Sequence, residues 1–253
     1  MSNEMKISVA EIFSSIQGEG PTIGYPSIFL RLGGCNLMCG GEGTQFDKQL
    51  HNGATWRCDT IEVWQKGKTT DIRTLIEALN DQHNLYERLR NGWHLIITGG
   101  EPFQQCRAIK FLLQMISYEQ TFNWNQIEFE TNGTIWNDNI AYWGNRGCQI
   151  NVSPKLANSG ETNERRYKRE SFQQICNLSN TFFKFVCNTE KDIEEVKTFF
   201  DFVPREKIYL MPGASNEVDL KKVSIWLAEE AMKMNVKFSS RLQVAIWNEV
   251  TGV

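Results

Sequence analysis

The sequence predicts an α/β fold built on a mostly parallel sheet. Short apolar runs rich in β-branched and aromatic residues alternate along the chain with longer runs in which apolar residues recur every three or four positions. The first kind of run is typical of buried strands, and the second is typical of helices that cover a sheet. Glycine and polar clusters follow several strand-like runs directly, and parallel sheets bind their ligands at the carboxyl ends of the strands. We therefore expect these clusters to meet on one face of the fold.

The expected strands are short apolar runs that stop at turn-forming residues. A strand-like run over 9–16 leads into a glycine-rich turn, and SIFLRL over 27–32 has the composition of a buried strand. HLIIT over 94–98 stops at Gly-Gly, and QIEFE over 126–130 stops at Thr-Asn-Gly. The remaining expected strands are 149–152, 182–186, 207–211 and the C-terminal run RLQVAIW over 241–247, which we expect to close the sheet.

The expected helices are runs with a spacing of three to four residues between apolar positions. They lie at 74–82, 108–116, 192–200 and 220–234, and the last has the clearest amphipathic pattern. No segment has the length and composition of an interdomain linker, so we expect residues 1–253 to form a single domain.

Composition and charge exclude several classes of protein. Hydrophobic residues make up 41% of the 253 residues and charged residues 23%, an ordinary globular balance that argues against a disordered or fibrous chain. The net charge of −3 is not that of a general nucleic-acid binder. No apolar run approaches the roughly 20 residues of a membrane span, and the first residues lack the apolar core of a signal peptide. We expect a cytoplasmic protein without a direct nucleic-acid or membrane partner.

Three of the seven cysteines form the most informative cluster in the sequence. Cys35 and Cys39 stand in GGCNLMCGG, and Cys58 follows in WRCDT. Zinc would require a fourth ligand, such as His51, whereas three thiolates suit a [4Fe–4S] cluster with one iron left open. Ordinary thiols are a third interpretation, and the spacing alone leaves all three open. Four cysteines stand singly and are expected to be structural: Cys106, Cys148, Cys176 and Cys187.

Motifs along the whole chain resemble those of one enzyme family. SIQGEGPTIGYPSIFLRLGGCNLMC, WRCDT, TGGEP, ETNG, SPK and RLQVAIW occur in the order typical of 7-carboxy-7-deazaguanine synthases, which are radical S-adenosylmethionine (SAM) enzymes of queuosine-type 7-deazapurine biosynthesis. The resemblance implies an incomplete TIM-like β/α barrel and a homodimer. It also implies a carbon–nitrogen lyase that converts 6-carboxy-5,6,7,8-tetrahydropterin to 7-carboxy-7-deazaguanine with loss of ammonia, served by an electron donor such as flavodoxin or ferredoxin.

The cysteine loop departs from the family pattern, which reads roughly Cys-x3-Cys-x-Trp-Cys-Asp-Thr. Eighteen residues separate Cys39 from Cys58 here. Asp59 and Thr60 nevertheless follow Cys58 as they do in the family. We therefore expect the three cysteines to hold the cluster on a loop that is expanded by an insertion at about 40–57.

The resemblance also implies roles for individual residues. SAM supplies the reacting radical, so no side chain is expected to be catalytic. Thr60 is expected to contact Mg²⁺, for which one hydroxyl is a weak site by itself. The residues expected to bind SAM are Gly99, Gly100, Glu101, Glu130, Ser153, Pro154 and Lys155. The residues expected to bind the substrate are Ile16, Gln17, Gly18, Glu19, Arg31, Thr98 and Val253.

The residue types fit these roles. The pterin edge carries an amide and an amino group and needs both donors and acceptors, which Gln17 and Glu19 offer together. Arg31 lies in an apolar run and needs a partner there, either the substrate carboxylate or an internal salt bridge. Without the resemblance, the IQGEG and TGGEP segments are ordinary glycine-rich turns. The three histidines show no ligand spacing and are expected to be structural or at the surface.

Two other functions remain open from the sequence. A different radical SAM reaction on a related pterin or purine is compatible with an insertion that reshapes the pocket. A non-catalytic, zinc-stabilised binding protein is compatible with three cysteines and one further ligand.

Overall fold

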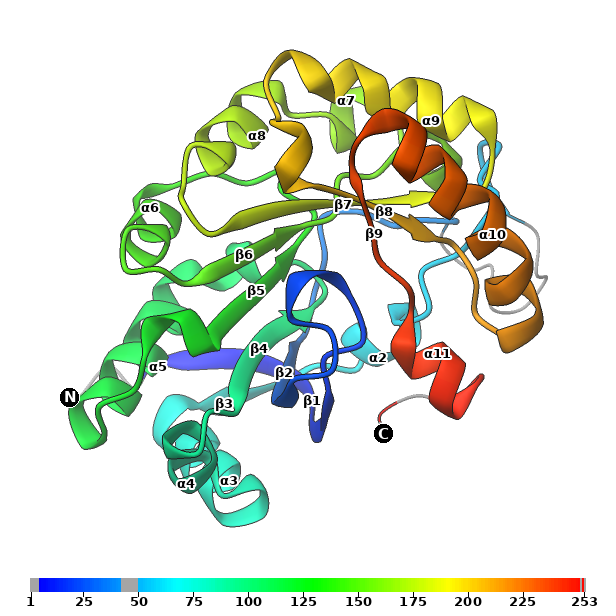
Figure 1. Cartoon of the computed structure of the whole chain (residues 1–253). Helices are drawn as coiled ribbons and strands as arrows, with labels where there is room; N and C mark the ends of the chain where they lie inside the picture. Colours follow the sequence, from blue (N-terminus) through cyan, green and yellow to red (C-terminus); the bar gives the residue numbers. More distant parts are fainter. Residues whose placement is uncertain (1–4, 42–49, 251, 253) are drawn as a thin grey trace.

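The architecture is a curved, nine-stranded sheet with helices along its outer side (Figure 1). A computed structural model describes residues 5–41, 50–250 and 252. The strand order is β3-β1-β2-β4-β5-β6-β7-β8-β9. Neighbours from β2 to β9 are parallel, whereas β1 runs antiparallel to both β2 and β3. Because β3 and β9 form separate edges, the sheet is an incomplete barrel, which confirms the expected fold class.

The strands coincide with the expected apolar runs, with ends shifted by up to three residues. Two short strands, β3 and β9, were not expected from the sequence. The strands are β1 (Lys6–Ile16), β2 (Pro26–Leu32), β3 (Lys68–Asp71), β4 (His94–Gly99), β5 (Ile127–Thr131), β6 (Gln149–Val152), β7 (Thr181–Cys187), β8 (Ile208–Pro212) and β9 (Lys237–Phe238).

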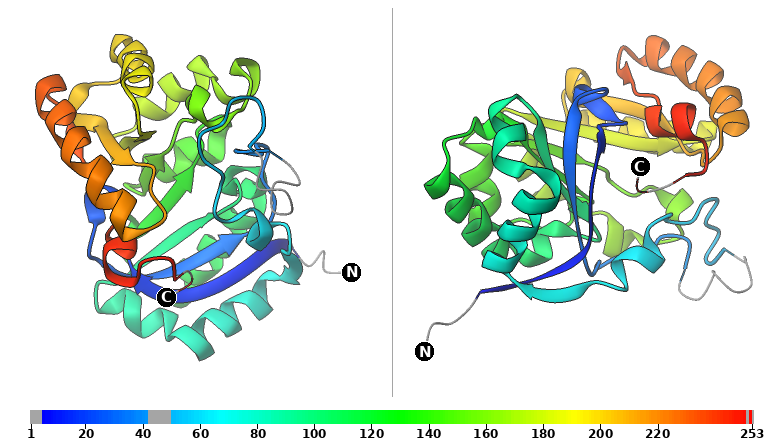
Figure 2. Two further views of the ribbon diagram at one scale, coloured as in Figure 1. Left: turned by 90° about the vertical axis from the view of Figure 1, so that its right-hand side faces the viewer. Right: turned by 90° about the horizontal axis from the view of Figure 1, so that it is seen from below.

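The helices form the crossovers that parallel strands require, and they cover the outer face of the sheet (Figure 2). No helix in the described ranges is both long and apolar enough to cross a membrane. The α-helices are α2 (Ile61–Trp64), α3 (Ile72–His83), α4 (Leu85–Arg90), α5 (Cys106–Glu119), α6 (Asp138–Gly144), α7 (Asn163–Arg166), α8 (Arg169–Cys176), α9 (Glu190–Lys197), α10 (Glu217–Met234) and α11 (Leu242–Trp247). The 3₁₀ turns are η1 (Gly20–Thr22), η2 (Pro102–Gln105), η3 (Trp124–Gln126), η4 (Ala157–Ser159), η5 (Thr198–Asp201) and η6 (Arg205–Lys207).

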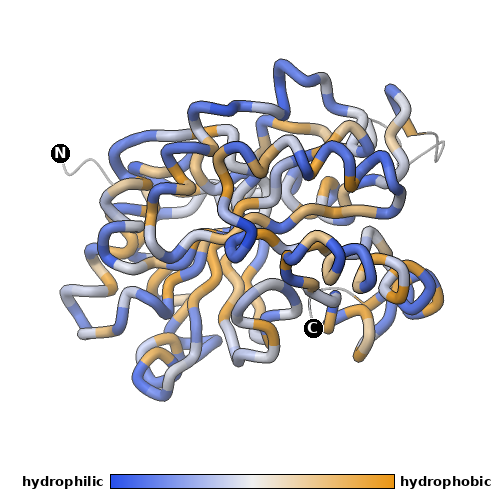
Figure 3. The backbone as a smooth tube through the Cα atoms, turned by 45° about the horizontal axis from the view of Figure 1, so that its top comes forward, coloured by the Kyte–Doolittle hydropathy of each residue, from blue (hydrophilic) through white to orange (hydrophobic). Residues whose placement is uncertain are grey.

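The main core fills the space between the sheet and these helices. The hydrophobic colouring of Figure 3 follows the central strands, and Ile97 of β4 and Phe129 of β5 are fully buried. The ring of Phe129 stacks on Trp143 of α6 with 4.7 Å between centroids and lies 5.5 Å from the ring of Phe103. This aromatic contact attaches η2 and α6 to the centre of the sheet.

One expected strand is a helix instead. RLQVAIW was expected to close the sheet, but its residues Leu242–Trp247 form α11. The two residues of β9 already occupy the edge beside β8. The chain then leaves the sheet, and the N–H of Leu242 donates to the carbonyl of Gly18 at 2.9 Å instead of to a strand. The expected closure by a strand is therefore wrong, and α11 lies at the open side between β9 and β1 (Figure 1).

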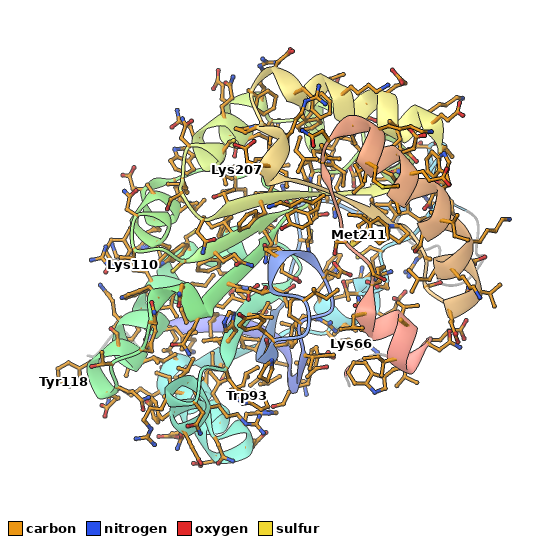
Figure 4. All side chains as sticks on the ribbon, in the orientation of Figure 1. Lys66, Trp93, Lys110, Tyr118, Lys207 and Met211 are labelled. Carbon is orange, nitrogen blue, oxygen red and sulfur yellow. The ribbon has the colours of Figure 1, made fainter. Side chains whose placement is uncertain are left out.

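We expect Phe129→Ala to lower the free energy of unfolding by about 3–5 kcal/mol, because it removes a fully buried ring and leaves a cavity. Urea unfolding followed by circular dichroism measures this loss. The control is Tyr118→Ala on α5, since Tyr118 is 90% exposed and projects away from the sheet (Figure 4), and it should change stability by no more than about 0.5 kcal/mol. Equal effects of the two substitutions would contradict this description of the core.

Candidate functional site

The polar segments that follow β4, β5 and β6 meet at one end of the sheet, as expected. The N–H of Glu101 donates to the carbonyl of Gly34 at 2.8 Å, which joins TGGEP to the cysteine loop. The hydroxyl of Thr131 donates to the Glu101 carboxylate at 2.7 Å. The N–H of Ser153 donates to the carbonyl of Thr131 at 2.7 Å, so SPK and ETNG are also adjacent. The predicted convergence of these segments is confirmed.

Glycine is required where TGGEP meets the cysteine loop. A Cβ atom on Gly100 would lie 1.6 Å from the carbonyl oxygen of Gly34, and one on Gly99 would lie 2.4 Å from backbone atoms of Leu32. Gly99 also has a φ of +114°, which side-chain-bearing residues rarely adopt. The close approach of the two backbones therefore explains both glycines of the motif.

The three clustered cysteines lie near one another. The N–H of Cys58 donates to the carbonyl of Cys39 at 3.1 Å, and the hydroxyl of Thr60 lies 3.3 Å from the Cys58 sulfur. Burial raises the pKa of Cys39 to about 12, an effect that Lys155 partly offsets and the other two cysteines reinforce. Burial likewise raises the pKa of Cys35 to about 11, with the Cys58 and Glu101 charges contributing. The charges of the three cysteines therefore act on one another.

Three thiols are a donor set that a [4Fe–4S] cluster with one open iron can use. Among the described residues, no three His, Cys, Asp or Glu side chains are placed to hold one metal ion. A zinc site needs its ligands around a single ion at about 2.0–2.3 Å. In a [4Fe–4S] cluster each thiolate binds a different iron, so the sulfurs stand farther apart. Lys155 also suits a cluster held by thiolates, because its positive charge lowers the pKa of both Cys35 and Cys39.

The SPK segment carries a cation beside this loop. Lys155 donates to the hydroxyl of Ser153 at 3.0 Å, and its ammonium lies 5.6 Å from the centre of the Trp56 ring. Pro154 between them is buried. Trp56 belongs to the expected insertion, and its indole N–H donates to Asn158 at 2.9 Å. The described part of the insertion therefore packs beside the segment that was expected to bind SAM.

Glu101 is engaged inside the protein. Its side chain is fully buried, and its carboxylate accepts hydrogen bonds from the N–H groups of Phe103 and Asn132 and from the Thr131 hydroxyl. Burial raises the pKa of Glu101 to about 6 in spite of these donors. The Glu101 carboxylate therefore joins η2 to the end of β5.

A second polar group lies inside the barrel. The amide of Gln17 donates to Glu130 at 3.2 Å, and the hydroxyl of Thr98 donates to the other oxygen of Glu130 at 2.8 Å. Gln17 and Thr98 were both expected in the substrate site, whereas Glu130 was expected to bind SAM. The structure thus places Glu130 beside two residues that were expected to bind the substrate. Ile16, which ends β1, and Gly18 flank Gln17 in the chain.

Lys184 is a residue of this group that the sequence analysis missed. It lies on β7 with 3% of its side chain exposed, and its ammonium is 3.1 Å from Glu19 and 3.5 Å from Glu130. Burial opposes ionisation of Glu19, but Lys184 and Arg241 hold the pKa of Glu19 down to about 2. The available signal was the lysine inside the apolar run FFKFV, since a charge buried there needs a partner.

Glu128 is a further residue that the sequence analysis missed, and it accepts a hydrogen bond from Gln17. It is fully buried on β5, and its carboxylate accepts from a set of donors that surrounds it. These donors are Gln17 at 3.5 Å, Thr22 at 2.9 Å, Gln149 at 3.0 Å, Asn151 at 3.0 Å and His94 at 2.5 Å. His94 is accordingly structural, as expected for a histidine without ligand spacing.

Arg31 pairs with Thr98 between β2 and β4, but its charge is engaged by a residue of β1. Arg31 forms an internal salt bridge with Glu11 at 2.6 Å, and its guanidinium lies 5.1 Å from the centre of the Phe13 ring. Of the two partners that the sequence left open for Arg31, the structure shows the internal one. Val253 lies outside the described residues.

The chain thus forms a curved, incomplete α/β barrel in which the cysteine loop, TGGEP and SPK meet at one end of the sheet. In sequence, the chain is similar to curated 7-carboxy-7-deazaguanine synthases. It is 27% identical to that enzyme from Halobacterium salinarum over an alignment of 272 residues. This alignment covers 96% of this chain and 91% of the relative. It is 28% identical to the Aquifex aeolicus enzyme over an alignment of 232 residues, and this alignment covers 90% of this chain and 86% of that enzyme. The resemblance of the motifs is thereby confirmed along most of the chain.

Two further comparisons give a sequence match over about half of the chain and a match in fold. The Rickettsia prowazekii 7-carboxy-7-deazaguanine synthase is 38% identical over 134 residues, which is 52% of this chain and 46% of that protein. The crystal structure of QueE from Escherichia coli has the same fold, with a TM-score of 0.58 and 22% identity over 94% of this chain and 95% of QueE. No family model matches the sequence.

We expect Glu19→Gln to lower the free energy of unfolding at pH 7 by about 3 kcal/mol, because Lys184 then stays buried without its nearest partner. The pKa of Glu19 is about 2 in the folded protein and near 4.5 otherwise, so its contribution is complete above pH 4.5 and declines as the pH falls toward 2. Urea unfolding at pH 7, 4 and 3 should therefore show a shrinking difference from the wild type.

The matched control for this experiment is Glu194→Gln. Glu194 is 69% exposed in an ion pair with Lys197 on α9, so its loss should matter little at any pH. A Glu19→Gln difference that stays constant from pH 7 to pH 3 would contradict a depressed pKa of Glu19.

Proposed function

We propose that this chain is a radical SAM enzyme that converts 6-carboxy-5,6,7,8-tetrahydropterin to 7-carboxy-7-deazaguanine with loss of ammonia. The observation that carries the proposal is the meeting of the cysteine loop with TGGEP and SPK directly next to a polar barrel interior. The similarity to curated synthases along most of the chain supports the same activity.

The proposed cofactor residues surround the end of the sheet. Cys35, Cys39 and Cys58 would hold a [4Fe–4S] cluster, while Gly99, Gly100 and 153–155 would hold SAM beside its open iron. Glu101 would fix the shape of this segment from inside the protein. Together these cofactors supply hydrogen-atom abstraction from the substrate. The protein contributes charge and position: Lys155 offsets the negative charge of the thiolates, and the two glycines of TGGEP let this segment pack directly against β2 and the cysteine loop.

The proposed substrate residues face the interior of the barrel. A pterin edge presents N–H donors and a carbonyl acceptor, which Gln17 and Glu130 match through an amide and a carboxylate. Arg31 would exchange its ion pair with Glu11 for the substrate carboxylate. Thr60 would contribute its hydroxyl to Mg²⁺, and the substrate carboxylate would complete that site.

The proposed partners are an electron donor such as flavodoxin or ferredoxin and a second copy of the chain.

One exposed face of α10 has the composition of an interface with a second copy. Val218, Ile225 and Met232 are 78%, 63% and 74% exposed and stand seven residues apart, which places them on one side of the helix. If two α10 helices pair antiparallel about Ile225, Lys221 of one copy faces Glu229 of the other. The apolar stripe and the flanking charges are therefore self-complementary, as a two-fold interface requires.

We expect the anaerobically reconstituted protein to contain about four iron and four sulfide per chain and to form 7-carboxy-7-deazaguanine, detected by mass spectrometry. Cys39→Ala should lose both the cluster absorbance and the product. Cys176→Ala is the control, because Cys176 is buried on α8 away from the cysteine loop, and it should keep both. A full cluster without this product indicates a different radical SAM reaction. One zinc without sulfide indicates the binding protein.

We expect Ile225→Asp to convert the dimer into a monomer, because it places a charge at the centre of the apolar stripe. Light scattering after size exclusion measures the mass. Lys221→Glu should weaken the dimer, and adding Glu229→Lys to it should restore the dimer by reversing both members of each pair. Tyr118→Asp on α5 is the control and should leave the mass unchanged. A dimer that survives Ile225→Asp would rule out this face.

A further inference from the structure

Arg241 connects three separate segments of the chain. Its Nε donates to Glu19 at 3.0 Å, one terminal nitrogen donates to Asp59 at 3.2 Å, and the other donates to the carbonyl of Ala214 at 2.7 Å. The planar guanidinium fixes these three directions relative to one another, which a flexible ammonium does not. Only 18% of the side chain is exposed, so water competes little for these contacts.

The two carboxylates belong to the two halves of the proposed site. Glu19 stands in the loop between β1 and β2, which carries Gln17 into the barrel. Asp59 directly follows Cys58, whose N–H donates to the carbonyl of Cys39 at 3.1 Å. Arg241 is therefore the link between the substrate loop and the end of the cysteine loop.

The segment around Arg241 is shaped to sit on the substrate loop. The N–H of Leu242 donates to Gly18, and the amide of Gln243 donates to Glu19 at 2.8 Å. A Cβ atom on Gly18 would lie 1.8 Å from the Gln243 side chain. Gly18, the first glycine of the IQGEG motif, thus leaves room for the Gln243 side chain.

Apolar packing contributes little to holding this segment. α11 has six residues, and among them only Val244 is buried. Val244 packs in a small cluster with Ala214 and Leu220 that is separate from the main core. An element with so few buried contacts opens locally at a lower free energy than the core strands. The polar contacts of Arg241 and Gln243 therefore decide how well α11 stays in place.

We propose that Arg241 is a positioning residue that holds the substrate loop and the cysteine loop in register with each other. The proposal rests on the proposed function for its catalytic consequence, but its structural content is independent of it. An error of about 1 Å between reacting groups lowers a rate by about 10²-fold. We expect Arg241→Gln to lower kcat/KM by about that factor while the iron content stays unchanged.

The first test is hydrogen exchange on the protein without its cofactors. Arg241→Gln should accelerate exchange in 17–25, 58–64 and 242–247 together, and leave α5 and β4 unchanged. Asp59→Asn removes only one arm, so it should accelerate exchange in 58–64 alone. Arg205→Gln is the matched control, because Arg205 contacts Met234 and Phe200 and lies outside this network, and it should change none of the three segments.

The second test is anaerobic turnover of the reconstituted variants. Arg241→Lys keeps the charge but cannot make all three hydrogen bonds at once. Its kcat/KM should therefore stay below a tenth of the wild-type value, close to that of Arg241→Gln. Faster exchange in α11 alone, or an unchanged kcat/KM with Arg241→Gln, would overturn the proposal and reduce Arg241 to an anchor of α11. If the wild type forms no 7-carboxy-7-deazaguanine while the three segments still respond together, the coupling stands and the proposed function fails.

Discussion

The buried ammonium group of Lys184 is the constraint on which the polar interior of the barrel depends. A charge with 3% exposure is strongly unfavourable without partners, so Lys184 requires the carboxylates of Glu19 and Glu130. Burial disfavours its charged form, but these two carboxylates raise the pKa of Lys184 above its ordinary value. The three residues come from β7, the loop after β1, and β5. Their pairing therefore keeps that loop inside the barrel, where Gln17 and Thr98 meet Glu130.

The long cysteine loop depends on a second set of contacts, which join its two ends. The N–H of Gly40 donates to the carbonyl of Ser159 at 2.9 Å, and the N–H of Thr55 donates to the carbonyl of Asn158 at 2.9 Å. Both ends of the insertion thus attach to the segment that follows SPK. Because the entropy of closing a loop grows only slowly with its length, extra residues between two attached ends are inexpensive. This explains how eighteen intervening residues leave Cys39 and Cys58 in contact.

Most of the fold could be predicted from the sequence because local patterns determine it. The apolar run of β4 and the helical spacing of α5 need no distant partner to be recognised. The run that forms α11 is short enough to fit either a strand or a helix, and the distant carbonyl of Gly18 decides between them. The same limit applies to the site. Lys184 and Arg241 reach Glu19 across 165 and 222 residues of sequence, and no local pattern announces such a pairing.

The carboxylates inside the barrel differ in how many of their acceptor positions are already occupied by protein donors. Glu128 is fully buried and surrounded by donors, and both oxygens of Glu19 are engaged by Lys184, Arg241 and Gln243. Glu130 differs, because 26% of its side chain is exposed and a carboxylate can accept about four hydrogen bonds. A ligand with N–H groups can reach Glu130 without breaking any ion pair. Glu130 therefore keeps accessible acceptor capacity, whereas both oxygens of Glu19 are occupied in holding the surrounding elements in place.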